Sequence, residues 1–448
     1  MEKYDEMPPQ TPCAQPKGFF NRFSKSIKIV VIGFLVLLML IPMFMIRDLI
    51  SERDRTQELA ISEVSNKWSQ AQTISGPYLQ IPYATLDKEN KVTTSSLILM
   101  PDELNIDGVL KTEKLKRGIY EVNVYQSEIT SKGSFSTEEL VKNRIEIDKL
   151  QLQKAEICFN ITDLRGISEQ INIVIGDSTY MFESGLDKNG LSNEGGVHTF
   201  ADLTSLTQNK NIPYEIKIKL KGSQSLYFLP IGRTTKVDLK ANWGTPSFVG
   251  NFLPTNRNIT NNDFTAQWQV LNLNRNFPQV LVGYSESVSS EIAGSSFGVN
   301  FKTPVEQYQQ TMRTAKYAIL IILLTFVVTF FTEIINKTHI NAFQYLLVGL
   351  ALCLFYCLLL SFAEHIGFNA AYLLAASMTV LLVSGYMFGI IKKKKPALII
   401  GGLLIMLYLY IFVLIQLETY ALLAGSLGLF IILALVMYFS KKIDWSND

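Results

Sequence analysis

The chain has 448 residues, of which 48% are apolar and only 18% are charged, and its mean hydropathy is +0.20. This combination argues against an ordinary soluble enzyme and indicates that the apolar residues are clustered. Lys and Arg total 41 and Asp and Glu total 39, so the net charge of +2 provides no basic surplus for binding nucleic acid. Four cysteines and three histidines are too few for a disulfide framework or a multi-histidine metal site.

Six apolar stretches predict helices that cross a membrane. The first covers residues 29–46, about 18 residues, which at 1.5 Å per residue is just long enough to cross a hydrocarbon core roughly 30 Å thick. It ends in Met43-Phe44-Met45-Ile46-Arg47, without the small residues of a signal-peptide cleavage site, so we expect a retained anchor. The other five lie in the C-terminal third, at residues 317–331, 342–363, 370–391, 397–416 and 421–439.

The Lys and Arg residues of the short loops predict the orientation, because basic residues resist translocation. With a cytoplasmic N-terminus, the loops at 364–369 and 417–420 lie outside and contain neither residue. We therefore predict that both termini are cytoplasmic. The predicted organisation is a disordered cytoplasmic tail at 1–28, a membrane helix at 29–46, an external β-rich domain with helical stalks at 47–316, a five-helix bundle at 317–439 and a cytoplasmic tail at 440–448.

The external segment has the alternating pattern of β-strands. Hydrophobic Ile216, Ile218 and Leu220 alternate with charged residues, and similar alternation occurs at 120–124, 157–161, 237–243 and 264–270. The expected fold class is therefore a membrane protein with six transmembrane helices (1 + 5) and a large, mainly antiparallel β domain between the first and second.

Helices should connect this domain to the membrane. Ile61, Val64 and Trp68 repeat at helical spacing beyond the first span, and Thr303-Pro304-Val305-Glu306 has the form of a helix start. Basic residues flank these stalks at Arg53, Arg55, Arg313 and Lys316. They are candidates for contact with lipid phosphates, and salt bridges to Glu52 and Asp54 are the alternative.

The search for catalytic motifs assigns no catalytic, metal-binding or cofactor-binding residue. Residues 294–298 match the G-x-S-x-G pattern of hydrolases, but Val299-Asn300-Phe301 continues as a predicted strand where that motif needs a helix. His198 is the external segment's only histidine, which leaves little for a catalytic triad. Phosphate-binding loops, H-E-x-x-H and zinc-type cysteine pairs are absent from the sequence.

Glu364 and His365 are the most polar neighbours at the external end of the bundle. Histidine titrates near neutrality, so acid–base chemistry is one interpretation, and a capped turn at the membrane interface is the favoured one. The predicted spans contain no ionisable residue at mid-depth, which disfavours a transporter.

Several stretches resemble the CreD family of inner-membrane cell-envelope integrity proteins. The most specific runs from Gln344-Tyr345 through Leu358 to Phe368, and it contains the family-motif candidates Gln344, Tyr345, Ser361, Glu364, His365 and Gly367. Further matches include Trp68 with Gln72, Phe248 with Phe252, Phe297-Gly298, Tyr308, Arg313 and Lys316. The family's His-Pro before the Gln-Tyr pair is replaced here by His339-Ile340.

The resemblance implies a bacterial inner-membrane protein with a periplasmic domain, linked to envelope integrity and in some bacteria to a regulatory system for envelope or β-lactam stress. Our leading hypothesis is a non-enzymatic integrity factor that sits in membrane lipid, uses no cofactor, and binds an envelope protein or a peptidoglycan component. A membrane-embedded enzyme or lipid-handling protein that uses Glu364 and His365 is the alternative, and a transporter is third.

Overall fold

The computed structural model describes residues 24–86, 92–185, 191, 195–204, 211–283, 285–301, 306–336, 338–391, 394–417 and 420–441. The chain divides into two compact units, Met1–Arg55 with Val305–Asp448 and Thr56–Pro304. Most of the predicted N-terminal tail and the predicted helix start at 303–305 lie outside the described residues.

The first membrane helix begins before the predicted apolar span and is interrupted at Met39. Helix α2 (Ser24–Leu38) starts inside the expected tail, and α3 (Leu40–Trp68) follows after a break at Met39. Pro42 lies just beyond the break, where it lacks the N–H that a continuous helix would use. Helix α3 continues well past the apolar run. Its residues up to Arg55 belong to the first unit, and its residues from Thr56 belong to the second.

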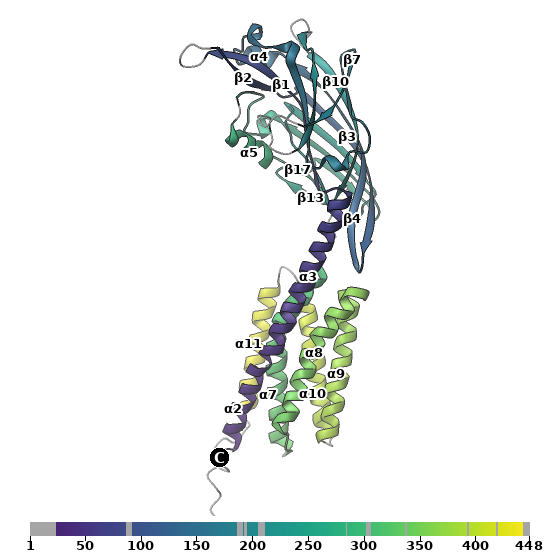
Figure 1. Ribbon diagram of the computed structural model, residues 1–448. Coiled ribbons are helices and arrows are strands. Elements are labelled where there is room, and N and C mark those ends of the chain that lie inside the picture. Colours follow the sequence, from purple (N-terminus) through teal and green to yellow (C-terminus); the bar gives the residue numbers. More distant parts are fainter. Residues whose placement is uncertain are drawn as a thin grey trace, which may run out of the picture. The chain divides into compact units, whose positions relative to one another are not determined.

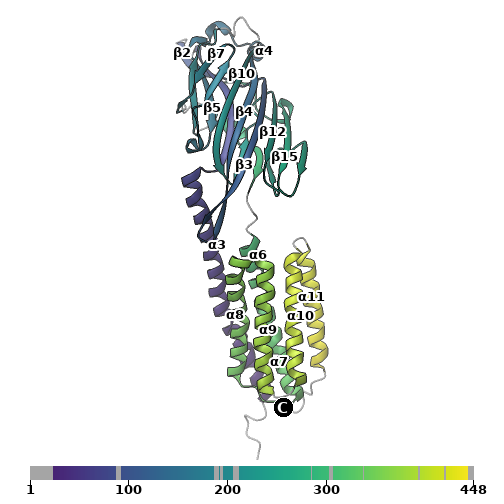
Figure 2. The ribbon, with the colours of Figure 1, turned by 90° about the vertical axis from the view of Figure 1, so that its right-hand side faces the viewer.

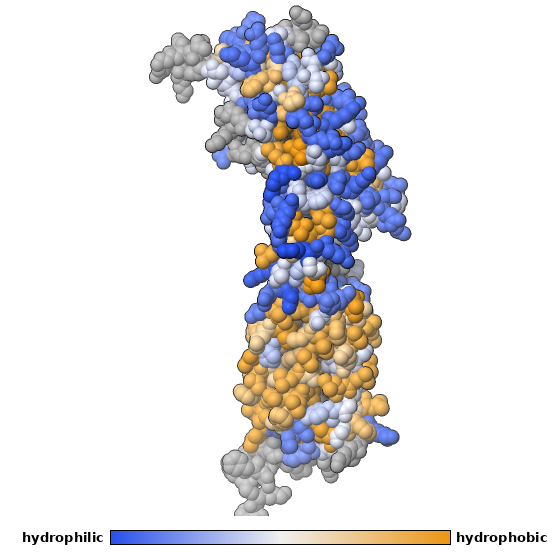
Figure 3. All heavy atoms as spheres, turned by 45° about the vertical axis from the view of Figure 1, so that its right-hand side comes forward, coloured by the Kyte–Doolittle hydropathy of each residue, from blue (hydrophilic) through white to orange (hydrophobic). Residues whose placement is uncertain are grey.

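The C-terminal part of the chain forms a helical bundle. Its helices are α6 (Glu306–Lys316), α7 (Ala318–Asn336), α8 (Ala342–Ile366), α9 (Phe368–Ile391), α10 (Lys394–Gln416) and α11 (Ala421–Ser440). In the described ranges, five helices are long and apolar enough to cross a membrane, namely Ile27–Trp68, Gln307–Asn336, Ala342–Ile366, Phe368–Ile391 and Lys394–Gln416, and α11 adds a shorter apolar one. Figure 2 shows α8, α9, α10 and α11 running side by side, and the bundle surface in Figure 3 is almost continuously hydrophobic. The prediction of six transmembrane helices is confirmed.

The second unit contains two sheets (Figure 1). One has the strand order β13-β17-β11-β1-β5-β9-β8, with β2 also paired to β1 and β16 to β2. Its strands are β1 (Gln72–Leu86), β2 (Val92–Leu99), β5 (Ala155–Ile161), β8 (Glu183–Ser184), β9 (Gly196–Ala201), β11 (Ser225–Phe228), β13 (Ser247–Gly250), β16 (Val280–Val282) and β17 (Phe297–Asn300).

The other sheet has the order β14-β15-β12-β3-β4-β10-β6-β7. Its strands are β3 (Glu103–Arg117), β4 (Tyr120–Ser136), β6 (Asn172–Ile175), β7 (Ser178–Met181), β10 (Asn211–Ser223), β12 (Thr234–Ala241), β14 (Asn256–Ile259) and β15 (Phe264–Leu271). Every predicted strand is present, and most neighbouring strands are antiparallel. The pairs β1 with β11 and β3 with β12 are parallel, so the domain is mainly antiparallel, as predicted, with two parallel pairs.

Alternate side chains of both sheets meet in one hydrophobic core. The strand β15 shows this most clearly, since Phe264, Ala266, Trp268 and Val270 are buried and the residues between them are exposed. An aromatic cluster surrounds Trp268, whose ring centroid lies 5.6 Å from Phe248 and 5.8 Å from Phe297. The periodicity read from the sequence therefore identifies the buried faces correctly.

Two short helices, α4 (Glu138–Lys142) and α5 (Glu286–Gly294), complete the β domain. The G-x-S-x-G match at 294–298 follows α5 and leads into β17. This helix-to-strand order is the reverse of the strand-to-helix order of a hydrolase nucleophile turn, in which Ser296 would be the nucleophile. The structure agrees with leaving this motif without a catalytic role.

Candidate functional site

Glu364 lies at the end of the bundle from which the chain leaves for the β domain. It occupies the last turn of α8 and is half-buried. Its Oε1 accepts a hydrogen bond of 2.9 Å from the hydroxyl of Tyr308, a buried residue of α6. The bond joins α6 to α8. Tyr308 was marked in the sequence only by the family resemblance, because its partner is 56 positions away.

The side chains of Glu364 and His365 do not form an acid–base pair. Consecutive residues of a helix point in directions about 100° apart and do not face each other. His365 is exposed, and among the described residues the hydrogen-bond partner of the Glu364 carboxylate is Tyr308 rather than His365. The hydrogen bond from Tyr308, which joins α6 to α8, supports a structural role for Glu364.

Gly367 ends α8 and begins the turn into α9. Its φ of +77° is a conformation that residues with a Cβ rarely adopt, and its N–H donates to the Ala363 carbonyl at 3.1 Å. Ser361 is exposed on α8. Among these motif residues, Gly367 therefore has a clear backbone role.

A cleft of about 240 Å³ lies between α3 and α6 at the same end of the bundle. Its lining combines apolar and charged side chains: Ile50, Ser51, Asp54, Tyr308, Gln309, Met312, Arg313 and Lys316. Two of the four predicted juxtamembrane residues, Arg313 and Lys316, thus contribute to it, whereas Arg53 and Arg55 are exposed on α3 outside the lining.

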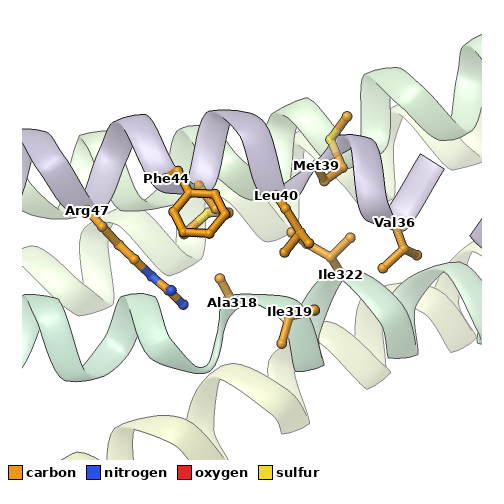
Figure 4. A pocket seen from close by; sticks show the side chains of 9 residues that line it. Val36, Met39, Leu40, Phe44, Arg47, Ala318, Ile319 and Ile322 are labelled. Atoms are coloured by element: carbon orange, nitrogen blue, oxygen red, sulfur yellow. The ribbon is translucent and has the colours of Figure 1, made fainter. Parts of the chain in front are cut away.

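A small apolar crevice of about 20 Å³ lies between α7 and the residues of α2 and α3 (Figure 4). It is lined by Val36, Met39, Leu40, Met43, Phe44, Arg47, Ala318, Ile319 and Ile322. Arg47 extends across it and donates to the Ala315 carbonyl at 3.1 Å, beside the interruption between α6 and α7 at Tyr317. The guanidinium therefore uses a carbonyl near a helix break, where helical hydrogen bonding is incomplete.

A buried carboxylate, Glu333, lies at the other end of the bundle, near the end of α7. It forms an ion pair with Lys28 of α2 and accepts hydrogen bonds from the Tyr345 hydroxyl at 3.1 Å and the Ile340 N–H at 3.2 Å. His339 is 3.5 Å away and largely exposed. The motif residue Tyr345 is therefore part of a polar cluster that connects α2, α7 and α8.

The sequence analysis missed Glu333 because the predicted span stopped at Phe331, whereas α7 continues to Asn336. The hydrophobic residues Ile334 and Ile335 after the carboxylate were the available signal. Nearby, Gln344 Oε1 accepts a hydrogen bond from the Asn341 N–H at 3.0 Å, at the first turn of α8. The other motif residue of the pair therefore organises the start of α8.

A polar junction connects the β domain to the end of α3, which belongs to the same unit. Gln72 accepts a hydrogen bond from the Asp163 N–H at 3.1 Å and donates to the Asp163 carbonyl at 2.9 Å. Asp163 accepts from the Gln70 N–H at 2.9 Å and from Arg165 Nε at 2.8 Å, while Arg165 also donates to the Asn66 carbonyl of α3 at 2.6 Å. A Cβ at Gly166 would lie 2.3 Å from a backbone oxygen, so the junction requires glycine there.

We expect the stability of the β domain to fall as the pH decreases from about 4 to about 2. Burial would raise the pKa of Asp163, but hydrogen bonds from the Arg165 side chain and from the Gln70 and Arg165 N–H groups outweigh it and hold the pKa at about 2. Because the pKa of Asp163 is lower in the folded than in the unfolded protein, its ionised form stabilises the fold. This contribution to the free energy of unfolding, about 2 kcal/mol, is complete above pH 4 and is lost as the pH falls through 2.

Equilibrium unfolding of the full chain in mixed micelles, followed by circular dichroism at several pH values, measures this. Asp163→Asn should flatten the dependence in this range. Asp107→Asn, which changes an exposed carboxylate of β3, should leave it intact. An unchanged acid profile in Asp163→Asn would contradict the assignment.

No group of three or more His, Cys, Asp or Glu side chains in the described ranges is placed to hold a metal ion. Cys158 is buried in β5, and Cys353 and Cys357 lie on α8.

Comparison with known proteins agrees with this architecture. A family model described as "Inner membrane protein CreD" matches residues 24–446. The chain is 31% identical over 418 residues to "Inner membrane protein CreD" of Escherichia coli (strain K12), which covers 92% of this chain and 91% of that protein. Together with the six apolar helices and the inserted β domain, these matches show that the chain is a multi-pass inner-membrane protein of the CreD family.

Proposed function

We propose that this protein is a non-enzymatic envelope-integrity factor whose β domain binds a component of the cell envelope while the bundle anchors it. The polar junction at Gln72, Asp163 and Arg165 is the observation that carries the proposal. It fastens the β domain to the end of α3, whose earlier turns belong to the bundle. Binding to the domain is in this way coupled to a membrane helix, as a tether or a transmitter requires.

The proposal includes an orientation with cytoplasmic termini and a periplasmic domain. The loop distribution of Lys and Arg supports it. A single cysteine at the exposed Asn258 of β14, in a variant lacking the native cysteines, should react with a membrane-impermeant maleimide in intact spheroplasts. Reaction only after membrane lysis would reverse the orientation.

The ligand of the β domain is proposed to be an envelope protein or a peptidoglycan component. Among the described residues, the candidate carboxylate Glu364 has a structural partner, because it accepts a hydrogen bond from Tyr308. A large β domain that is attached to a membrane helix is better suited to binding a partner than to catalysing a reaction. Crosslinking of the full chain in intact cells tests this, and absence of any envelope protein or peptidoglycan adduct would contradict it.

Complementation of a deletion strain tests the role in the cell, with detergent and β-lactam sensitivity as readouts and membrane levels checked for each variant. A chain lacking 56–304 should fail to rescue, and the double variant Glu364→Ala with His365→Ala should rescue. The opposite result would favour the membrane-embedded enzyme or lipid-handling alternative. Glu333 does not support the transporter alternative, because it lies near the end of α7 rather than at the middle of the helix.

A further inference from the structure

The interruption of the first membrane helix at Met39 has the form of a hinge. Pro42 has no N–H to donate to the carbonyl of Leu38, so one helical hydrogen bond is missing there. The turn nevertheless remains closed, because the Met39 N–H donates to Leu35 at 3.0 Å and the Met43 N–H donates to Met39 at 3.4 Å. The chain therefore keeps its helical course but loses stiffness at this turn.

The bundle holds Met39 in place. Its side chain is only 2% exposed and lies against Gly349 of α8. A Cβ at Gly349 would lie 2.7 Å from the Met39 sulfur and 3.0 Å from the Phe326 ring of α7, so the methionine occupies space that a larger residue would fill. Because α7 and α8 enclose Met39, its position is fixed while the helix on either side of it can change direction.

The two halves of the helix are attached to the bundle differently. Helix α2 packs closely against α7 and α8, and its Lys28 pairs with the buried Glu333. Helix α3 approaches α7 and α8 less closely than α2 does. It is separated from α7 by the apolar crevice and from α6 by the cleft of about 240 Å³. A gap in side-chain packing removes contacts from both of its walls, so α3 is the half that is free to move.

Arg47 closes the crevice at the end opposite Val36 (Figure 4). One of its terminal nitrogens donates to the Ala315 carbonyl at 3.1 Å. Its Nε is buried and has no hydrogen-bond partner within the described ranges. A buried N–H without an acceptor costs free energy, which offsets part of what the bond to Ala315 contributes. The closed arrangement is therefore close in free energy to one in which water solvates the guanidinium.

We propose that the first membrane helix is hinged at Met39 and latched by the bond from Arg47 to Ala315. Helix α3 exchanges between a closed state, in which this bond is formed, and an open state, in which α3 has swung away from α7. Helix α2 stays in place in both states, because Lys28 holds it to Glu333. The hinge requires no particular ligand of the β domain, so its test is independent of the proposed function.

Double electron–electron resonance on the full-length chain in lipid nanodiscs measures the two states. Spin labels are attached to cysteines at the exposed positions Arg53 of α3 and Ala370 of α9, in a variant lacking the native cysteines. The wild type should give a main distance for the closed state and a minor one for the open state. A single distance that stays the same in every variant below overturns the proposal.

The latch is tested by Arg47→Gln, which should raise the ratio of open to closed molecules about tenfold, the change expected for one charged hydrogen bond. Arg55→Gln is the matched control, because it removes an exposed arginine two turns further along α3. An unchanged ratio in Arg47→Gln, or the same increase in Arg55→Gln, overturns the latch.

The hinge is tested by Pro42→Ala, which restores the missing N–H and should narrow the distance distribution to one population. Pro396→Ala is the matched control, because Pro396 lies in the first turn of α10, where an N–H has no partner within the helix. A distribution as broad in Pro42→Ala as in the wild type, or equal narrowing in Pro396→Ala, overturns the hinge.

Gly349→Ala tests the seat of Met39 on α8. The added Cβ meets the Met39 sulfur and should increase the open population, whereas Gly402→Ala of α10 should not, because a Cβ there meets no atom within 4 Å. Equal effects of the two substitutions contradict the seat. Each variant must retain the wild-type thermal transition. If Pro42→Ala does not fold, Arg47→Gln decides the outcome, since it changes a partly exposed side chain.

Discussion

Trp268→Ala is expected to lower the free energy of unfolding of the β domain by about 3–5 kcal/mol, the range for removing a large buried aromatic side chain. The Trp268 side chain is only 2% exposed, and its Nε1 donates to the Phe252 carbonyl at 3.2 Å. Truncation leaves a cavity beside Phe248 and Phe297 and an unsatisfied carbonyl.

Hydrogen exchange of the full chain, resolved by peptide, measures this loss across β12 and β15 without relying on tryptophan fluorescence. Phe200→Ala on β9 is the control, because that ring is 64% exposed and its removal should cost less than 1 kcal/mol. Equal exchange in the two variants would show that the aromatic cluster does not stabilise the domain.

Glu333→Leu is expected to destabilise the bundle by about 3 kcal/mol, because removal of one member of a buried ion pair leaves the other uncompensated. Lys28 loses its carboxylate, and the Tyr345 hydroxyl and Ile340 N–H lose their acceptor. Equilibrium unfolding in mixed micelles, followed by the helical circular dichroism signal, gives the change in free energy.

A second substitution tests whether the charge pair is responsible. Glu333→Leu combined with Lys28→Met should recover at least about 1 kcal/mol, because the unpaired ammonium is gone. His339→Ala is the control, since the His339 side chain is 90% exposed and should contribute little. If the double variant were less stable than Glu333→Leu, the pair would not account for the effect.

Local patterns were sufficient to predict the membrane helices and the buried strand faces. Apolar length predicts a span, and alternation predicts which side of a strand is buried, because both depend on neighbouring residues. Residues of β10 and β15 illustrate this, with hydrophobic positions buried and intervening ones mostly exposed. Helix α2 extends beyond the predicted apolar span to Ser24 and includes Lys28, whose partner Glu333 is 305 positions away and could not be inferred from local pattern.

Long-range partners were beyond the reach of these patterns. The bonds of Tyr308 to Glu364 and of Arg165 to α3 join residues 56 and 99 positions apart. The parallel pairing of β3 with β12 likewise depends on how the chain returns to the sheet, which alternation does not encode. The family resemblance included Tyr308, Trp68 and Gln72 among its matches, and the structure shows which groups they contact.

The position of β1 has a mechanical consequence. This strand begins soon after α3, and its hydrogen bonds connect it to β11, β5 and β2. Bonds between strands lie roughly perpendicular to the strand direction, so a pull along β1 strains many of them together instead of one after another. A force that reaches the β domain through α3 is therefore applied in shear across the interior of a sheet, where the domain should resist extension most strongly.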